Sequence, residues 1–198
     1  MGIKLGSFET DKWIKVISFK VKEKSLYNLD TLYELLREWF IDHEYCPRDD
    51  EEFPEILYKE EVAQDGAKNH FIWWRFEKQA KGVSDIFYKI DVTFLTIRIQ
   101  KAEVVVNGKK YKTNKGECEI NITAKIKMKT PKQLQKGIFA LILKWLWQKG
   151  LKEKIRMHFN ELHNELYELQ NAIKEYYQLN SYKTAKYLEF EPKRGYIK

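Results

Sequence analysis

The residues best suited to chemistry are four histidines, at positions 43, 70, 158 and 163, and a pair of carboxylates on a predicted helix. His158 and His163 are five residues apart, which separates them by about 140° around a helix, so one face cannot present both to a metal ion. Glu161 and Glu165 share a face, a spacing that suits a carboxylate metal site between packed helices. The preceding segment 131–149 contains no Asp, Glu or His to complete that site. The sequence therefore predicts neither a metal site nor a cofactor.

Other catalytic patterns are weaker still. His43 and Cys46 stand close together near a helix end, but a cysteine nucleophile needs a base that the fold orients, and sequence proximity does not supply one. The acidic run 49–52 lacks the spacing and the central glycine of a calcium loop. No glycine-rich phosphate loop, GxSxG nucleophile motif or HExxH zinc motif is present. We therefore expect a protein that is not an enzyme.

Composition defines the class of protein. The 198 residues are 43% hydrophobic and 15% aromatic, which excludes a disordered chain, and 9 Gly with 4 Pro exclude collagen-like and low-complexity sequences. No apolar run is long enough to cross a membrane. Cys46 and Cys118 do not form a disulfide framework, and the N-terminus lacks the apolar region of a signal peptide. We expect a cytoplasmic or virion location. The surplus of lysine over arginine is typical of thermophilic proteins.

The first two thirds of the chain predict strands around one helix. Apolar residues at Leu32, Leu35, Leu36, Trp39 and Phe40 form the stripe of a helix that Asn28 or Asp30 caps and that ends near His43. Alternating or wholly apolar segments predict the strands 13–21, 56–62, 70–78, 85–99 and 117–128, and Asn107-Gly108 predicts a hairpin turn between 104–106 and 109–112. The apolar positions of 85–99 shift by one residue after Phe94, which indicates a bulge or a tight bend.

The last third predicts two helices. The first is opened by Thr130-Pro131, is apolar nearly all round between Gly137 and Trp147, and is expected to stop at Gly150. The second runs from about 151 to 178 and carries a strict heptad strip at Ile155, Phe159, Leu162, Leu166, Leu169, Ile173 and Tyr176. This strip can pack on the first helix, as the two arms of a hairpin, or on a neighbouring subunit.

These elements predict an α+β fold: an antiparallel β-sheet with an N-terminal helix and a C-terminal long helical hairpin. We expect a single domain over 1–198. Its parts are 1–130, mainly β with one helix; 131–179, the helical hairpin; and 180–198, an extended tail.

Charge is divided unevenly along the chain, whose net charge is +7. Residues 42–65 hold ten carboxylates against two basic residues, and residues 101–136 hold ten lysines against three glutamates. Opposed blocks of this kind favour head-to-tail association of identical chains. The basic block can alternatively contact nucleic-acid phosphates, and its candidate residues are Lys109, Lys110, Lys112, Lys125 and Lys127.

Four segments resemble a group of small uncharacterised proteins predicted in archaeal genomes and in archaeal virus-like elements. They are NLDTLYELLREWF (28–40), HFIWWRFEK (70–78), VVVNGKKYKTNKGE (104–117) and ELYELQNAIKEYY (165–177). The resemblance covers about a quarter of the chain and implies an archaeal or viral context without a defined activity.

We therefore predict a non-enzymatic, self-assembling structural protein, a subunit of a virus-like particle, tube or other large homo-oligomer. Its main partner would be itself, with no membrane span. The candidate subunit interface is Trp73, Trp145, Trp147, Ile155, Phe159, Leu162, Leu166, Leu169, Ile173 and Tyr176. The alternative is a basic nucleic-acid-binding accessory protein that uses the lysines of 101–136. The two differ in their response to salt, because phosphate contacts weaken steeply with ionic strength and apolar contacts do not.

Overall fold

The computed structural model describes residues 11–24, 26–49, 51–106, 109–129 and 140–182, with side chains described except at 105, 106, 109, 111, 140–152 and 179–182. In this part of the chain, six strands form one antiparallel sheet in the order β1-β6-β5-β4-β3, with β2 pairing to β6. The strands are β1 (Trp13–Glu23), β2 (Leu26–Tyr27), β3 (Glu55–Val62), β4 (Lys68–Gln79), β5 (Ile86–Val106) and β6 (Lys109–Met128).

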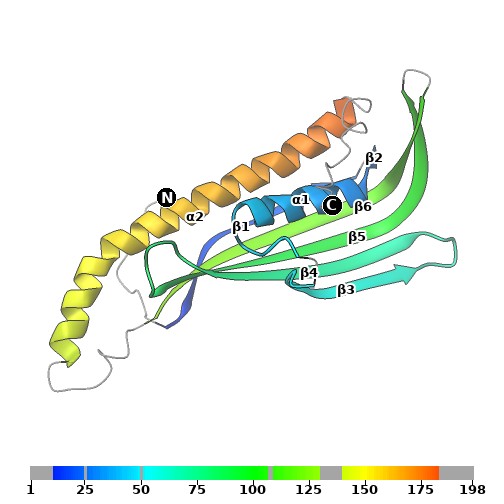
Figure 1. The fold of residues 1–198 in the computed structure, drawn as a ribbon. Helices are drawn as coiled ribbons and strands as arrows, with labels where there is room; N and C mark the ends of the chain where they lie inside the picture. Colours follow the sequence, from blue (N-terminus) through cyan, green and yellow to red (C-terminus); the bar gives the residue numbers. More distant parts are fainter. Residues whose placement is uncertain (1–10, 25, 50, 107–108, 130–139, 183–198) are drawn as a thin grey trace, which may run out of the picture.

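Two helices, α1 (Leu29–Asp42) and α2 (Ala140–Tyr182), cover the same face of this sheet (Figure 1). The side chain of Asn28 caps α1 by accepting a hydrogen bond from the backbone N–H of Thr31, at 3.1 Å. The helix ends at Asp42, next to the predicted end at His43. Asn28 also contacts α2, because its backbone carbonyl accepts a hydrogen bond from the Tyr176 hydroxyl at 2.7 Å. The start of α1 is therefore attached to both the sheet layer and the long helix.

The predicted fold class is wrong, because the C-terminal helices do not form a hairpin. One helix continues through Gly150, so the chain is mostly β, with a six-stranded sheet and two single helices. A glycine inside a helix costs about 1 kcal/mol relative to alanine. That cost is small beside the stabilisation that α2 gains where its heptad strip is buried against the sheet. The proposed opening of the first helix at Thr130-Pro131 and the tail from 183 to 198 lie outside the described residues.

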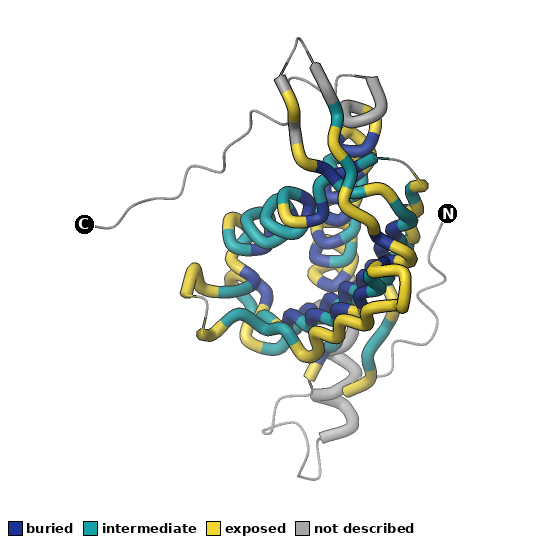
Figure 2. The backbone as a smooth tube through the Cα atoms, turned by 90° about the vertical axis from the view of Figure 1, so that its right-hand side faces the viewer, coloured by how far each residue is buried: buried dark blue, intermediate teal, exposed yellow. Residues whose placement is uncertain are grey.

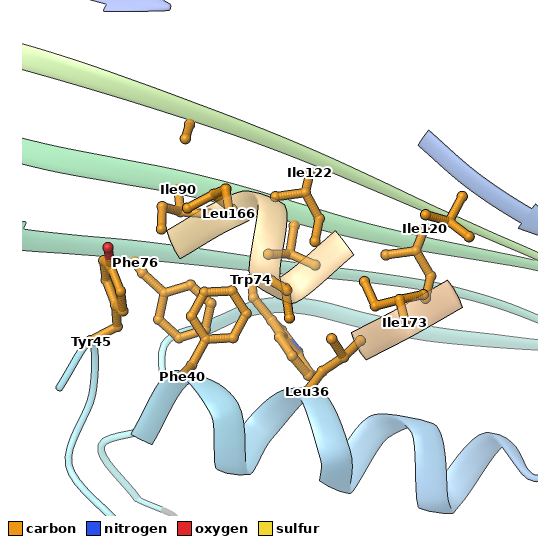
Figure 3. Close-up of a cluster of buried hydrophobic side chains, with 14 of the residues drawn as sticks. Leu36, Phe40, Tyr45, Trp74, Phe76, Ile90, Ile120, Ile122, Leu166 and Ile173 are labelled. Carbon is orange, nitrogen blue, oxygen red and sulfur yellow. The ribbon is translucent and has the colours of Figure 1, made fainter. Parts of the chain in front are cut away.

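The core lies between the sheet and the two helices. Figure 3 shows Leu36 and Phe40 of α1 meeting Trp74 and Phe76 of β4, and the rings of Phe40 and Phe76 stack with their centroids 3.9 Å apart. The 14 residues of α1 span only about 21 Å, so this helix covers part of the sheet. The heptad strip of α2 covers the remainder. In Figure 2 the buried positions line the inner face of the sheet and the helix surfaces that face it.

The strands β5 and β6 form a long hairpin that extends beyond the other strands (Figure 1). The β5–β6 register shifts between Ile97 and Gln100, so β5 does contain an irregularity, but it begins three residues later than the apolar shift after Phe94 predicted. Thr96 stays in the core and Ile97 is exposed. Arg98 lies inside this bulge with φ of 53°, and its backbone N–H donates to the Asn69 side-chain oxygen at 2.7 Å. Opposite the bulge, a Cβ atom on Gly116 would lie only 3.0 Å from the backbone oxygen of Arg98 and 3.1 Å from that of Ile97, so the close approach of the two strands favours glycine here.

Among the described residues, neither helix has an apolar stretch of the length that a membrane crossing requires.

Candidate functional site

The predicted basic region does not form one surface. Lys110 and Lys112 are exposed on the projecting end of the β5–β6 hairpin, whereas Lys125 and Lys127 lie near the opposite end of β6. Lys112 and Lys125 are thirteen positions apart, which corresponds to about 40 Å of strand. The side chain of Lys109 lies outside the described residues. The described lysines therefore form two separate pairs, Lys110 with Lys112 and Lys125 with Lys127, and the second pair lies in the body of the sheet.

Aromatic side chains that are far apart in the sequence lie next to Lys125 and Lys127 in the sheet. β1 pairs with β6 so that Trp13 lies opposite Lys127, and β5 pairs with β6 so that Phe87 lies on the other side of the same lysine. Two residues further along each strand, Lys15, Lys125 and Lys89 lie side by side in the same way. We call this surface the lysine–aromatic face, and its residues are Trp13, Lys15, Phe87, Lys89, Lys125, Lys127 and Lys129.

Cations lie over both rings of the lysine–aromatic face. The ammonium groups of Lys127 and Lys89 are 4.7 and 5.3 Å from the centroid of the Trp13 ring. The ammonium of Lys129 is 4.2 Å from the centroid of Phe87. Such contacts hold a cation over an aromatic ring by electrostatic attraction to its π electrons. The rings are half-buried, so their outer faces remain reachable from solvent.

Acidic neighbours neutralise only part of this charge. Lys89 is paired with Glu77 at 2.7 Å, and Lys125 lies 3.5 Å from Asp91, which also binds Arg75 at 2.7 Å. In the described part of the chain, no carboxylate lies within ion-pair distance of Lys127 or Lys129. The face therefore keeps a net positive charge on a sheet surface that neither helix covers.

The proposed subunit interface is distributed differently from the sequence-based expectation. Six residues of the heptad strip are buried against the chain's own sheet, and Phe159 is half-buried: the six are Ile155, Leu162, Leu166, Leu169, Ile173 and Tyr176. In this conformation they are not free to contact a second subunit. Trp73 is half-buried on the outer face of the sheet with the Arg75 guanidinium 4.5 Å from its ring centroid. The side chains of Trp145 and Trp147 lie outside the described residues.

Exposed apolar side chains gather instead at the β3 edge of the sheet. Among the described residues, six of the eight large hydrophobic side chains that remain exposed lie on β3, β4 and the adjoining part of β5. We call them the apolar edge: Ile56, Leu57, Tyr58, Val62, Phe71 and Ile97. Exposure reaches 61% at Val62, so this edge is not an extension of the core. A concentration of this kind marks an interaction surface.

Both edges of the sheet are open within the described residues. β3 pairs only with β4, and β1 pairs only with β6, so each leaves one side of its backbone without a strand partner. β3 carries three glutamates against one lysine, whereas β1 carries three lysines against one glutamate. Unpaired edges are templates for pairing with another chain unless charge, bulges or cover prevent it. Each strand does contain one register irregularity, between Lys15 and Ile17 in β1 and between Glu55 and Leu57 in β3.

A buried polar cluster, which the sequence did not indicate, connects α2 to the sheet. His158 is only 2% exposed, and its Nδ1 lies 2.7 Å from the Tyr88 hydroxyl and 3.1 Å from Glu161 Oε2. A carboxylate can only accept, so Nδ1 carries the proton and Nε2 is an acceptor. This Nε2 is buried and has no hydrogen-bond partner among the described residues.

Glu165 and Lys78 continue the same cluster toward the surface. The Tyr45 hydroxyl donates to Glu165 Oε2 at 2.7 Å, and burial raises the pKa of both Tyr45 and Tyr88. Lys78 donates to the backbone carbonyl of His43 at 2.7 Å, and burial lowers the pKa of its ammonium. The cleft here has a volume of only about 160 Å³. Glu161 and Glu165 therefore act as hydrogen-bond acceptors for tyrosines, and no group of described residues has the composition of a metal site.

A cleft of about 670 Å³ lies between the start of α1 and the β3–β4 hairpin. His70 is at its wall, but both ring nitrogens are occupied: Nδ1 by the Thr96 hydroxyl at 2.7 Å and Nε2 by Glu60 at 3.1 Å. The side chain therefore links neighbouring strands, and neither nitrogen is left to bind a ligand.

Comparison of the chain with models of protein families, with curated proteins and with solved structures found no match in any of the three.

Proposed function

We propose that this protein is a self-assembling structural subunit whose copies join head to tail through the open edges of the sheet. The observation that carries the proposal is the apolar edge, where β3 pairs with β4 on one side only and exposes Ile56, Leu57, Tyr58 and Val62. Edge strands of monomeric proteins normally avoid this combination, because exposed apolar side chains and unpaired backbone groups together promote strand pairing between chains.

Charge favours β1 of a second copy as the partner of β3. Pairing two β3 strands would bring two acidic strands together, and pairing two β1 strands would bring two basic strands together. Like charges directly opposite each other destabilise strand pairs, whereas opposite charges stabilise them. The lysines of β1 retain ion pairs within the chain, such as Lys20 with Glu119 at 2.8 Å, so charge selects the partner and apolar contact supplies most of the affinity.

Pairing of β3 with β1 is a heterologous contact, in which two different surfaces of identical subunits meet. Such contacts generate a ring if the rotation between subunits closes and an open filament if it does not. Both products fit a tube or the shell of a virus-like particle. The archaeal or viral setting that the sequence resemblance implies belongs to the same proposal.

Size-exclusion chromatography with light scattering tests this proposal on the full chain at micromolar concentration. We expect particles several times heavier than the 23.9 kDa chain, in low salt and in 1 M NaCl. At 1 M salt charges are screened beyond about 3 Å, so the surviving assembly would report apolar contact. A monomer under both conditions would overturn the proposal.

A pair of matched variants locates the contact. Leu57→Lys with Val62→Lys adds two charges to the apolar edge and should convert the particles to monomers. Met157→Lys with Tyr167→Lys adds the same charges at exposed positions of α2 and should leave them intact. Equal loss of assembly in both variants, or in neither, would contradict an edge contact.

A further inference from the structure

We propose that the lysine–aromatic face binds single-stranded nucleic acid. The face does not include the apolar edge, but its residues Trp13 and Lys15 lie on β1, the strand that the proposed assembly pairs with β3. Strand pairing would use the backbone of β1, whereas the face consists of side chains on the outer surface of β1, β6 and β5.

The first argument is the arrangement of rings and charges. Trp13 and Phe87 lie on either side of Lys127 in one row of paired residues. Neighbouring strands are about 4.8 Å apart, so the two rings are separated by about 10 Å. Two bases can therefore stack separately while the lysine between them contacts the linking phosphate. Grooves that bind single strands combine aromatic stacking surfaces with positive charge in this way.

The second argument is the supply of phosphate contacts. The adjacent row places Lys15 opposite Lys125, and Lys125 opposite Lys89. Lysine is a flexible point charge without the planar fork that arginine uses to recognise base edges. The face therefore fits phosphate binding with little dependence on base sequence.

The third argument favours a single strand over a duplex. In a duplex the bases stack on each other and their flat surfaces are inaccessible to a protein side chain. Only an unpaired strand offers those surfaces to Trp13 and Phe87. The cations now over these rings, Lys127 at 4.7 Å and Lys129 at 4.2 Å, are on flexible side chains that can move to the phosphates as bases take their place.

The test is fluorescence anisotropy of a labelled 20-nucleotide oligothymidylate titrated with the full chain. Removal of one stacking ring, in Trp13→Ala or Phe87→Ala, should weaken binding about 5- to 150-fold. Trp13→Phe should retain most of the affinity because it keeps a stacking ring. Trp73→Ala is the matched control, since it removes another ring beneath a cation on the same sheet surface, and it should bind like the parent.

Salt dependence separates charge from stacking. Lys127→Gln with Lys129→Gln should reduce the slope of log affinity against log salt by about 1.4, because each single-strand phosphate contact contributes about 0.7. Lys110→Gln with Lys112→Gln makes the same charge change about 40 Å away and should leave the slope unaltered.

Three results would overturn the inference. One is the absence of oligothymidylate binding by the parent protein at low salt. The second is binding to a 20-base-pair duplex that is as tight as binding to the oligothymidylate and is weakened as much by Trp13→Ala. The third is binding to phosphatidylserine vesicles with the same loss in the Trp13 and Phe87 variants, which would identify a membrane surface instead.

Discussion

Replacing Tyr88 by phenylalanine should destabilise the fold by about 1–3 kcal/mol, through the buried histidine that it contacts. Tyr88 is 2% exposed, so the substitution removes one oxygen without opening the core to water. That oxygen is 2.7 Å from His158 Nδ1, and its loss leaves the imidazole with Glu161 as its only partner, at 3.1 Å. Because His158 Nε2 is already unpartnered, the ring has no alternative hydrogen bond with which to compensate.

Urea denaturation followed by circular dichroism measures this effect, and thermal denaturation should show a lower midpoint. A loss of 1–3 kcal/mol corresponds to a fall of about 2–12 °C for a chain of this size. Tyr167→Phe is the matched control, because Tyr167 is 46% exposed on α2, the helix that carries His158. The stability of this variant should differ from that of the parent by less than about 0.5 kcal/mol.

A double variant distinguishes a lost hydrogen bond from a packing defect. In Tyr88→Phe with His158→Leu both polar partners are removed together, and the buried imidazole with its unpartnered Nε2 is no longer present. Replacement of both partners by apolar groups can be nearly neutral, so the double variant should be more stable than Tyr88→Phe alone. The reasoning is refuted if Tyr88→Phe is as stable as the parent. It is also refuted if the loss of stability in the double variant equals the sum of the losses in the two single variants.

Three further predictions concern other parts of the molecule. Gly116→Ala should destabilise the fold by about 1–3 kcal/mol in urea denaturation, since its Cβ would lie only 3.0 and 3.1 Å from the backbone oxygens of Arg98 and Ile97; an unchanged midpoint would show that the two strands move apart without cost. Lys22 and a second lysine hold the pKa of Glu117 below its usual 4.5, so this ion pair stabilises the fold above pH 4.5 and is lost as the pH falls through the lowered pKa. Lys22→Gln should therefore reduce the difference in denaturation midpoint between pH 7 and pH 3, and an equal difference would contradict the pairing. Burial raises the pKa of Cys118 to about 11, so iodoacetamide at pH 8 should modify this thiol only after unfolding, as read by mass spectrometry; rapid modification of the native protein would disprove its burial.

Local sequence patterns located most of the strands and the first helix. The alternation in 117–128 corresponds to the second half of β6, where every even residue is buried and every odd one is not. Asn28 caps α1 as one of the two candidates, and β5 contains a register irregularity, although it lies between Ile97 and Gln100 and not directly after Phe94. These features depend on residues two to four positions apart, so the sequence contains the information that sets them.

The hairpin prediction failed because Gly150 has two local interpretations. A glycine after an apolar helical segment is typical of a helix end, but a continuing helix also tolerates it at modest cost. The choice depends on what the following heptad strip packs against. In the structure Leu162, Leu166 and Leu169 pack on the inner face of the sheet, which α1 alone is too short to cover.

The candidate sites depended still more on tertiary structure. The run of lysines in 101–136 forms one block in the sequence, yet β6 carries its two ends to opposite ends of the sheet because a strand is extended. The aromatic partners of the lysines near Met128 come from β1 and β5, and Trp13 is far from Phe87 in the sequence. Likewise, His158 meets Tyr88 only because α2 lies across β5.

By itself, the amino-acid sequence determined which segments are strands, where α1 begins, and that the chain lacks recognisable catalytic motifs. Tertiary structure alone decided that α2 is one helix, that the heptad strip is core, and that an acidic apolar strand lies at one edge of the sheet and a basic strand at the other. The physical reason is that secondary structure follows from the periodicity of neighbouring side chains, whereas strand pairing and helix packing are chosen by the apolar area that the whole chain can bury.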